Sequence, residues 1–480
     1  MPHTRTRLTT VREGHADGHV LEAALDEIRR ELELPSGFDA DVLAEAEQAA
    51  RSPKPSDHDW TDVEFVTVDP PGATDLDQAM HLERRDGGYR VRYAIADVAA
   101  FVEPGGLVDA EARRRGQTLY APDARVPLHP PVLSEDAASL LPGVARPAYV
   151  WVLDLDADGE TVAVDCVRSM VRSRAQLEYE DLQANLDDGR APEAISLLGE
   201  IGRKRIELEH ARAGASLAIP DQEVVETPSG YELRFRPPVP AEDWNAQISL
   251  MTGMAAADLM LAGEIGVLRT MPGPDRRTIA RFHRQADALG AHWPAEMPYG
   301  DFLRSLDATD PQLLALLHAS ATLFRGAGYT PFDGAVPEQV RQAAVGAPYA
   351  HVTAPLRRLV DRFTLVVCES ICRDREVPDW VRAALPELPA VMADSDRRAG
   401  ALENASLAAA EAVVLADRVG ESFEAVVVDV ADDGDSGDVQ LLAPAVLARV
   451  EGHVELGAAV TVVLEAADAT TRTLRFVPAP

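Results

Sequence analysis

The chain has 480 residues, 46% of them hydrophobic, which is enough to bury a large core and to form two to four domains. We expect neither export nor membrane insertion, because no run of about eighteen uncharged apolar residues follows the arginine-containing start or occurs elsewhere. The net charge of -33 and the pI of about 4.7 argue against a general affinity for nucleic acid, since an acidic surface repels a polyanion.

The basic residues are almost all arginines. Of the 46 basic residues, only Lys54 and Lys204 are lysines. The planar arginine fork suits bidentate contacts to phosphate, so an arginine-lined channel in an acidic body remains compatible with the composition. The same abundance of arginine would also follow from genomic base composition, and composition alone leaves the choice open.

The three cysteines are Cys166, Cys368 and Cys372, an odd number that fits a reducing compartment better than a disulfide framework. Cys368 and Cys372 share a helix face, but no histidine or further cysteine stands at ligand spacing, so packed thiols are expected rather than a zinc site. We therefore expect a cytoplasmic protein.

Residues 1–60 are predicted to form a small helical module. A polar tail precedes a helix over 19–34, a Pro-Ser-Gly turn, and a second helix over 39–51. The sequence leaves open whether these two helices form a helix-turn-helix.

The rest of the chain changes from strand to helix and back to strand. Turn signals at 86–88, 156–159 and 229–230 separate alternating runs, with one helix expected over 106–116. Helical periodicity then predicts helices over 244–263, 274–290, 310–326, 356–373 and 403–420. Five short alternating strands after about residue 420 predict a small barrel. We expect an α+β chain with domains at 1–60, 61–417 and 418–480.

Four oxygen-bearing side chains stand close together in the run VTVDPPGATDLDQAM: Asp69, Asp75, Asp77 and Gln78. A strand over 63–68 ends at the first of them, and the Pro-Pro-Gly that follows bends the chain back. Converging carboxylates resist ionisation unless a hard cation such as Mg²⁺ or Mn²⁺ takes up their charge, and such a site suits phosphate chemistry. On spacing alone, an ordinary aspartate-rich turn is the better interpretation.

The surrounding sequence decides for the metal site. Beside the acidic run it contains YAIADVAAFV, DAEARRRGQTLYAPDARVPLHPPVLSEDAASL and, further along, YAHVTAPLRRLVDR. Together these blocks resemble the catalytic domain of the ribonuclease II/RNase R (RNB) family, and the last is similar to the family's second signature. It implies an RNB-type catalytic domain, β-rich in its first half and helical in its second. The final barrel resembles the RNA-binding OB-fold that closes such chains. Residues 1–60 stand where typical members carry paired cold-shock domains, so a short form without them is expected.

The resemblance also implies roles for single residues. Asp69, Asp75 and Asp77 match three of the family's four catalytic-site aspartates, with Asp77 at the position most critical for cleavage. Gln78 replaces the fourth; its amide offers a metal an uncharged oxygen, so weaker binding of a second ion and slow or absent cleavage are expected. Tyr120 matches the aromatic residue that packs near the RNA 3′ end, whereas without the family it would be interpreted as a core tyrosine.

Arg357 and Arg358 are candidate phosphate ligands on a separate argument. The sequence predicts a helix start here, with Thr353 as the cap and Pro355 in the first turn. Two arginines near the positive end of a helix dipole favour a bound anion. An ion pair with Asp361 would explain them equally well, and the resemblance favours phosphate binding, for Arg357 more than for Arg358.

We therefore predict a Mg²⁺-dependent exoribonuclease, with Mn²⁺ as an alternative metal. It is expected to act as a monomer on single-stranded RNA from the 3′ end, releasing nucleoside 5′-monophosphates, with no organic cofactor and no membrane partner. The alternative is an RNA-binding or regulatory protein of the same fold that has lost efficient cleavage through Gln78. A phosphotransferase of the haloacid-dehalogenase type is disfavoured, because Gln78-Ala79 follows Asp77 where that motif carries threonine.

Overall fold

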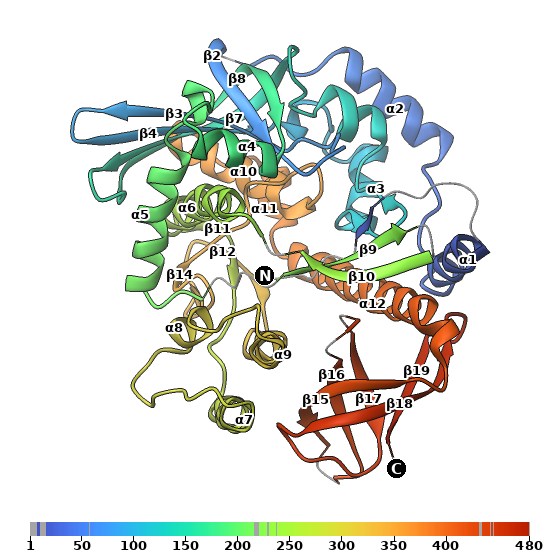
Figure 1. The fold of residues 1–480 in the computed structure, drawn as a ribbon. Helices are drawn as coiled ribbons and strands as arrows, with labels where there is room; N and C mark the ends of the chain where they lie inside the picture. The colour runs from blue at the N-terminus through green and yellow to red at the C-terminus, as the bar shows by residue number, and fades with distance from the viewer. Residues whose placement is uncertain are drawn as a thin grey trace.

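The computed structural model describes residues 7–9, 16–56, 58–215, 220–227, 230–236, 238–431, 434–441, 443–444 and 446–479. Most of the predicted polar tail, and residue 229 of the third predicted turn, lie outside these ranges. The fold is α+β, as predicted, with two closed barrels and a helical region (Figure 1).

The first barrel has the strand order β2-β3-β4-β7-β8 and is closed by parallel pairing of β2 with β8. Two hairpins turn at the predicted positions, between β3 and β4 and between β7 and β8. Its large core side chains include Trp151 and Tyr93, both fully buried. The strands are β2 (His58–Val68), β3 (Gln78–Arg85), β4 (Gly88–Ala96), β7 (Ala145–Asp156) and β8 (Thr161–Leu177).

The segment between β4 and β7 carries Tyr120. It includes α3 (Leu107–Arg115), which confirms the predicted helix, and the hairpin of β5 (Leu119–Tyr120) with β6 (Arg125–Val126). Gly116 ends α3 with φ +75°, and a Cβ there would lie 2.7 Å from the Cβ of Ser395. Glycine is therefore needed here for two reasons. It adopts the positive φ, and it allows the chain around Ser395 to approach closely.

Two helices after β8 were not predicted, since only strands and one helix were expected between residues 61 and 240. They are α4 (Tyr179–Asp187) and α5 (Leu198–Ala211). Gly199 and Gly202 lower the helix propensity of α5, which weakens its pattern. Packing overrides propensity there, because the two glycines admit Trp244, and a Cβ on Gly202 would lie 2.4 Å from the Trp244 Cβ.

The middle of the chain is mainly helical, as predicted, with short strands that were not. β11 and β12, which were not predicted, pair antiparallel within the helical region. β9 and β10 are the two strands predicted around the third turn signal, and they pair antiparallel. β1, which was not predicted, pairs parallel with β9. The strands that were not predicted are too short for their alternation to be distinguished from neighbouring patterns. The elements are β1 (Arg7–Thr9), β9 (Asp221–Thr227), β10 (Gly230–Arg236), α6 (Pro240–Ala262), β11 (Ile265–Thr270), α7 (Arg276–Ala288), α8 (Tyr299–Arg304), α9 (Pro311–Ala319), β12 (Gly328–Asp333), β13 (Arg341–Gln342), β14 (Ala347–Pro348), α10 (Leu359–Cys372), α11 (Asp379–Ala384) and α12 (Leu388–Leu415).

The second barrel lies at the C-terminal end of the chain and confirms the five predicted strands (Figure 1). Its order is β15-β16-β17-β19-β18, around a core that contains Phe423 and Phe476 in edge-to-face contact. The strands are β15 (Ser422–Val430), β16 (Ser436–Leu441), β17 (Leu447–Glu451), β18 (Ala459–Asp468) and β19 (Thr473–Pro478).

The two predicted N-terminal helices are α1 (Ala16–Glu31) and α2 (Ala40–Arg51), and they pack on different cores. Leu25 of α1 belongs to the apolar cluster shared by α12 and the second barrel. Ala46 of α2 belongs to the cluster beneath the first barrel, with Phe65. The domain limits at 60/61 and 417/418 stay predictions.

Helix α12 connects the regions of the fold. The stretch Leu388–Arg418 is long and apolar enough, by length and composition alone, to cross a membrane. In the structure α12 packs against α1, β10, β18 and β19, as a core helix of a globular protein does. Length and composition therefore carry little weight here as evidence for a membrane span.

A buried acid on α12 gives a prediction about stability. Burial raises the pKa of Glu411 to about 8, while the unfolded chain ionises it near 4.5. The folded form thus binds an extra proton between these values, so this residue lowers stability as pH rises from about 4.5 to 8. Glu411→Gln should leave stability near pH 4.5 little changed and raise the free energy of unfolding at pH 8 by roughly 1–3 kcal/mol, measured by urea denaturation.

Asp417→Asn, at an exposed carboxylate just after α12, is the matched control and should show no such pH-dependent gain. An equal gain for both variants at pH 8 would contradict a specific burial effect at Glu411.

Candidate active site

The acidic run forms the loop between β2 and β3, and both of its ends are fixed to the first barrel. The backbone N–H of Asp69 donates to the carbonyl of Leu177 on β8 at 3.0 Å. The bend follows at Gly72, which has φ +74°. At the other end the carbonyl of Asp77 accepts from the N–H of Ala96 at 2.9 Å. The predicted return of the chain towards Asp69 is therefore built by the barrel itself.

The second signature segment meets this loop, although 279 residues separate the two in sequence. The N–H of Leu356 donates to Asp77 Oδ1 at 2.8 Å, and Arg357 Nε lies 3.4 Å from Asp77 Oδ2. Asp77 is only 5% exposed, so both contacts lie in a largely dry environment. The structure thus brings the two sequence motifs together at one carboxylate.

The predicted helix start at Thr353 is wrong. Helix α10 begins at Leu359, and residues 353–358 form a turn that ends in a β-bridge between Arg358 and Gln117. The carboxylate of Asp361 caps this turn by accepting from the N–H of Ala354 at 2.7 Å. Proline in a turn and proline in a first helical turn share the same φ, so the sequence did not distinguish them.

Arg357 and Arg358 have different environments. Arg358 is held by Asp361, with Nη2 to Oδ1 at 2.7 Å and Nε to Oδ2 at 3.0 Å. This is the ion pair that the sequence analysis weighed against phosphate binding. Arg357 is 31% exposed at its side chain, and neither of its Nη atoms has a hydrogen-bond partner among the described residues. Arg357 is therefore the arginine that presents free donors at the site.

The carboxylates repel one another and are largely buried. Burial and the charge of Asp75 raise the pKa of Asp69 to about 7, against the opposing influence of Arg357. Burial also raises the pKa of Asp77 well above its usual range, while Arg357 and the N–H of Leu356 oppose this. Asp69 Oδ2 is buried without a hydrogen-bond partner. An electropositive ligand at this oxygen would relieve both the repulsion and the unmet acceptor.

Arg125 is a site residue that the sequence analysis missed. Its Nη1 donates to Asp75 Oδ1 at 2.7 Å, and its Nη2 lies 2.8 Å from Glu135 Oε2. Tyr120 pairs with Arg125 across the β5–β6 hairpin, and the Tyr120 hydroxyl donates to Asp75 Oδ2 at 3.2 Å. The signal was present in the sequence, because a four-residue turn after Tyr120 places Arg125 opposite it.

Tyr120 itself lies at the surface of the site. It is 40% exposed, which excludes the interpretation as a core tyrosine.

Gln78 is engaged by its neighbours through both ends of its amide. Its Oε1 accepts from the Tyr93 hydroxyl at 2.5 Å, and its Nε2 donates to the carbonyl of Thr353 at 2.6 Å. In this arrangement the amide oxygen is used by a buried tyrosine, and the amide nitrogen ties β3 to the 353–358 turn. Gln78 thus acts as a structural bridge between the two signature segments.

The donor chemistry of the site fits a hard divalent cation, with Asp69, Asp75 and Asp77 as oxygen donors. Among the described residues, however, no three acidic, histidine or cysteine side chains lie close enough together to form a ready-made cage. Arg125 and Arg357 contact two of the carboxylates, Asp75 and Asp77. Only Asp69 keeps an oxygen with no partner, so it is the position where a cation would enter.

Two family profiles match this chain. The family profile described as RNB domain matches residues 57–371, and the profile described as RNase II-type exonuclease C-terminal S1 domain matches residues 421–479. Among curated proteins, the exosome complex exonuclease RRP44 homolog A of Arabidopsis thaliana is 28% identical over 316 residues, covering 62% of this chain and 33% of that protein. The chain thus corresponds to about a third of this relative's length.

Two solved structures of similar fold have different descriptions, one as RNase R and the other as a pseudonuclease. The apo form of Mycoplasma genitalium RNase R matches with a TM-score of 0.85 at 16% identity, covering 96% of this chain and 78% of that one. Yeast Ssd1, described as a pseudonuclease, matches with a TM-score of 0.71 at 17% identity, covering 93% and 58%. Since the RNB profile covers more than half of the chain, including every predicted site residue, the chain belongs to the RNB family of exoribonucleases and their relatives.

Proposed function

We propose that this chain is a divalent-metal-dependent exoribonuclease that shortens single-stranded RNA from its 3′ end and releases nucleoside 5′-monophosphates. The observation that carries the proposal is the meeting of the Asp69–Gln78 loop with the 353–358 turn at the buried Asp77. A protein of similar fold supports RNA as the substrate. The structure of Mycoplasma genitalium RNase R has been solved in complex with ribose-methylated single-stranded RNA.

In this proposal three carboxylates bind the metal, an arginine binds the phosphate and a tyrosine contacts the terminal nucleotide. Asp69, Asp75 and Asp77 would hold Mg²⁺ or Mn²⁺, which when bound activates water and stabilises the leaving 3′-oxygen. The free Nη atoms of Arg357 donate to the scissile phosphate and fix its position against the carboxylates. The exposed ring of Tyr120 stacks beside the terminal nucleotide.

The first prediction about the site concerns cleavage. With 5′-labelled single-stranded RNA and Mg²⁺ or Mn²⁺, the wild-type chain should give a descending ladder that ends in a short core. Asp77→Asn should give no products, because it removes the charge at which the two signature segments meet. Gel electrophoresis of a time course measures both. Internal products from the wild type would contradict the exonuclease proposal.

A second candidate function is RNA binding without efficient cleavage. It is favoured by Gln78, which takes the place of a carboxylate and is occupied by Tyr93 and Thr353. Yeast Ssd1 shows that the fold also occurs in a protein described as a pseudonuclease. Wild-type chain that binds the labelled RNA but does not shorten it with either metal would establish this second function and overturn the first.

The second prediction concerns Gln78→Asp. A carboxylate here should lower the Mn²⁺ concentration needed for half-maximal cleavage, because it adds charge to the site. It also removes the amide nitrogen that donates to the Thr353 carbonyl. We therefore expect a loss of roughly 1–3 kcal/mol in the free energy of unfolding, measured by denaturation without metal. An unchanged requirement for Mn²⁺ would show that position 78 does not contact the cation.

The third prediction compares two adjacent arginines. Arg357→Gln should lower the cleavage rate and weaken RNA binding, since its Nη donors are free, and it should destabilise folding less than Arg358→Gln does, since its contact with Asp77 is long and its side chain partly exposed. Arg358→Gln should instead destabilise the fold by roughly 3–5 kcal/mol, because it leaves the fully buried Asp361 without its charged partner. RNA cleavage and urea denaturation, measured on both variants, separate the two roles. The reverse pattern would contradict the assignment.

A further inference from the structure

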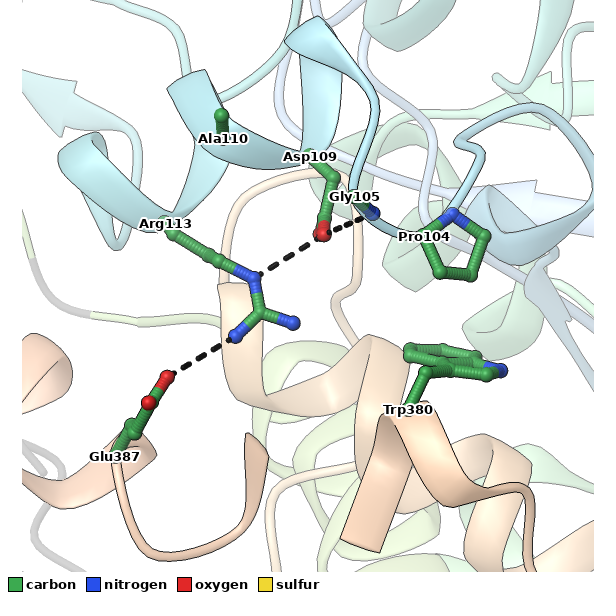
Figure 2. A pocket seen from close by; sticks show the side chains of 7 residues that line it. All are labelled: Pro104, Gly105, Asp109, Ala110, Arg113, Trp380 and Glu387. Atoms are coloured by element: carbon green, nitrogen blue, oxygen red, sulfur yellow. Dashed lines mark hydrogen bonds and ion pairs between the residues drawn. The ribbon is translucent and has the colours of Figure 1, made fainter. Parts of the chain in front are cut away.

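A pocket of about 470 Å³ lies on a part of the surface that the proposed function does not use. It is formed by the start of α3, by α11 and by the residue before α12, and its lining includes Pro104, Asp109, Arg113, Trp380 and Glu387 (Figure 2). No lining residue comes from the 69–78 loop or the 353–358 turn. Its volume is in the range of pockets that hold small ligands.

The aromatic wall of this pocket is rigid. The Trp380 ring lies 5.4 Å from the Phe363 ring, and the Arg362 guanidinium lies over it at 5.0 Å. Arg362 is itself anchored by Asp109 at 2.5 Å. Trp380 nevertheless remains partly exposed. It therefore presents a partly exposed ring, held in place by Phe363 and Arg362, on which a planar group would stack.

The opposite wall presents an arginine fork and a carboxylate. Asp109 Oδ2 accepts from Arg113 Nε at 3.2 Å and from the N–H of Gly105 at 2.9 Å. This tether leaves the Nη atoms pointing away from α3, towards the pocket (Figure 2). Glu387 lies 3.5 Å from Arg113 Nη1 and is 70% exposed, a contact longer than a good hydrogen bond. Fork and carboxylate both keep capacity for a ligand.

We propose that this pocket binds a guanine base. Guanine carries two adjacent acceptors, O6 and N7, which match the two donors of an arginine fork. Its N1–H and 2-amino donors match the carboxylate of Glu387, and its ring stacks on Trp380. Adenine is disfavoured, because its 6-amino group presents a donor to the arginine where guanine presents O6.

The base has two chemical sources, a free guanine nucleotide or a guanosine within single-stranded RNA. The second source rests on the proposed RNA substrate, whereas the first does not. The binding experiment below is done without divalent metal, so its outcome is independent of the cleavage assay. Failure of either one leaves the other standing.

The test is calorimetric titration of the full chain in EDTA with guanosine 5′-monophosphate and adenosine 5′-monophosphate. We expect the guanine nucleotide to bind about tenfold more tightly. Arg113→Lys, which keeps the charge and loses the fork, should bring the two affinities to within about twofold. Glu387→Ala, at an exposed residue whose loss does not threaten the fold, should do the same. Arg114→Lys, the exposed neighbour paired with Glu111, is the matched control and should keep the preference.

Equal binding of the two nucleotides by the wild type, no binding of either, or a guanine preference that survives both Arg113→Lys and Glu387→Ala would each overturn the proposal. The source is resolved with the Asp77→Asn chain and two RNA oligomers, all-adenosine and the same with one central guanosine. Tighter binding of the second oligomer assigns the pocket to RNA. Equal binding of the oligomers, with the nucleotide preference intact, assigns it to a free guanine nucleotide.

Discussion

The hydrogen bond from the Leu356 N–H to Asp77 is the contact on which the site depends. It joins a loop of the first barrel to a turn of the helical half, and it does so at a carboxylate that is almost fully buried. A buried acid with a raised pKa is costly unless donors or cations face it. The turn supplies both, through a backbone N–H and Arg357. The first barrel and the helical half are therefore held together by the same charge that the proposed chemistry would use.

Although the chain is strongly acidic, arginines offset part of the acidic charge around the site. Around the site, most arginines are already paired with acids: Arg125 with Asp75, and Arg358 with Asp361. These pairs lower the local repulsion but leave few cations for a polyanion. Arg357 stands out because its Nη donors are free. Affinity for RNA would then rest on a small number of positioned contacts, and a net charge of -33 constrains it without forbidding it.

Much of this was predictable where the sequence signal is local. The strand before Asp69, the bend at Gly72 and the five strands of the second barrel follow from alternation and turn residues. Helix α5 was missed because its glycines serve packing against Trp244, a contact that no local pattern records. The start of α10 was placed too early for a similar reason, since the capping group at the turn is Asp361, inside the helix, rather than Thr353 before it.

Gln78 shows most clearly what sequence reasoning could not supply. From the motif alone, Gln78 is interpreted as a metal ligand without charge. That interpretation records only the carboxylate that is missing. In the structure its amide accepts from Tyr93 and donates to the Thr353 carbonyl, and an aspartate has no donor for the second contact. Under the proposed function, the exchange trades a charged oxygen at the metal for a tie between the two signature segments. The proposed cleavage rate and the rigidity of the site are then set against each other at this one side chain.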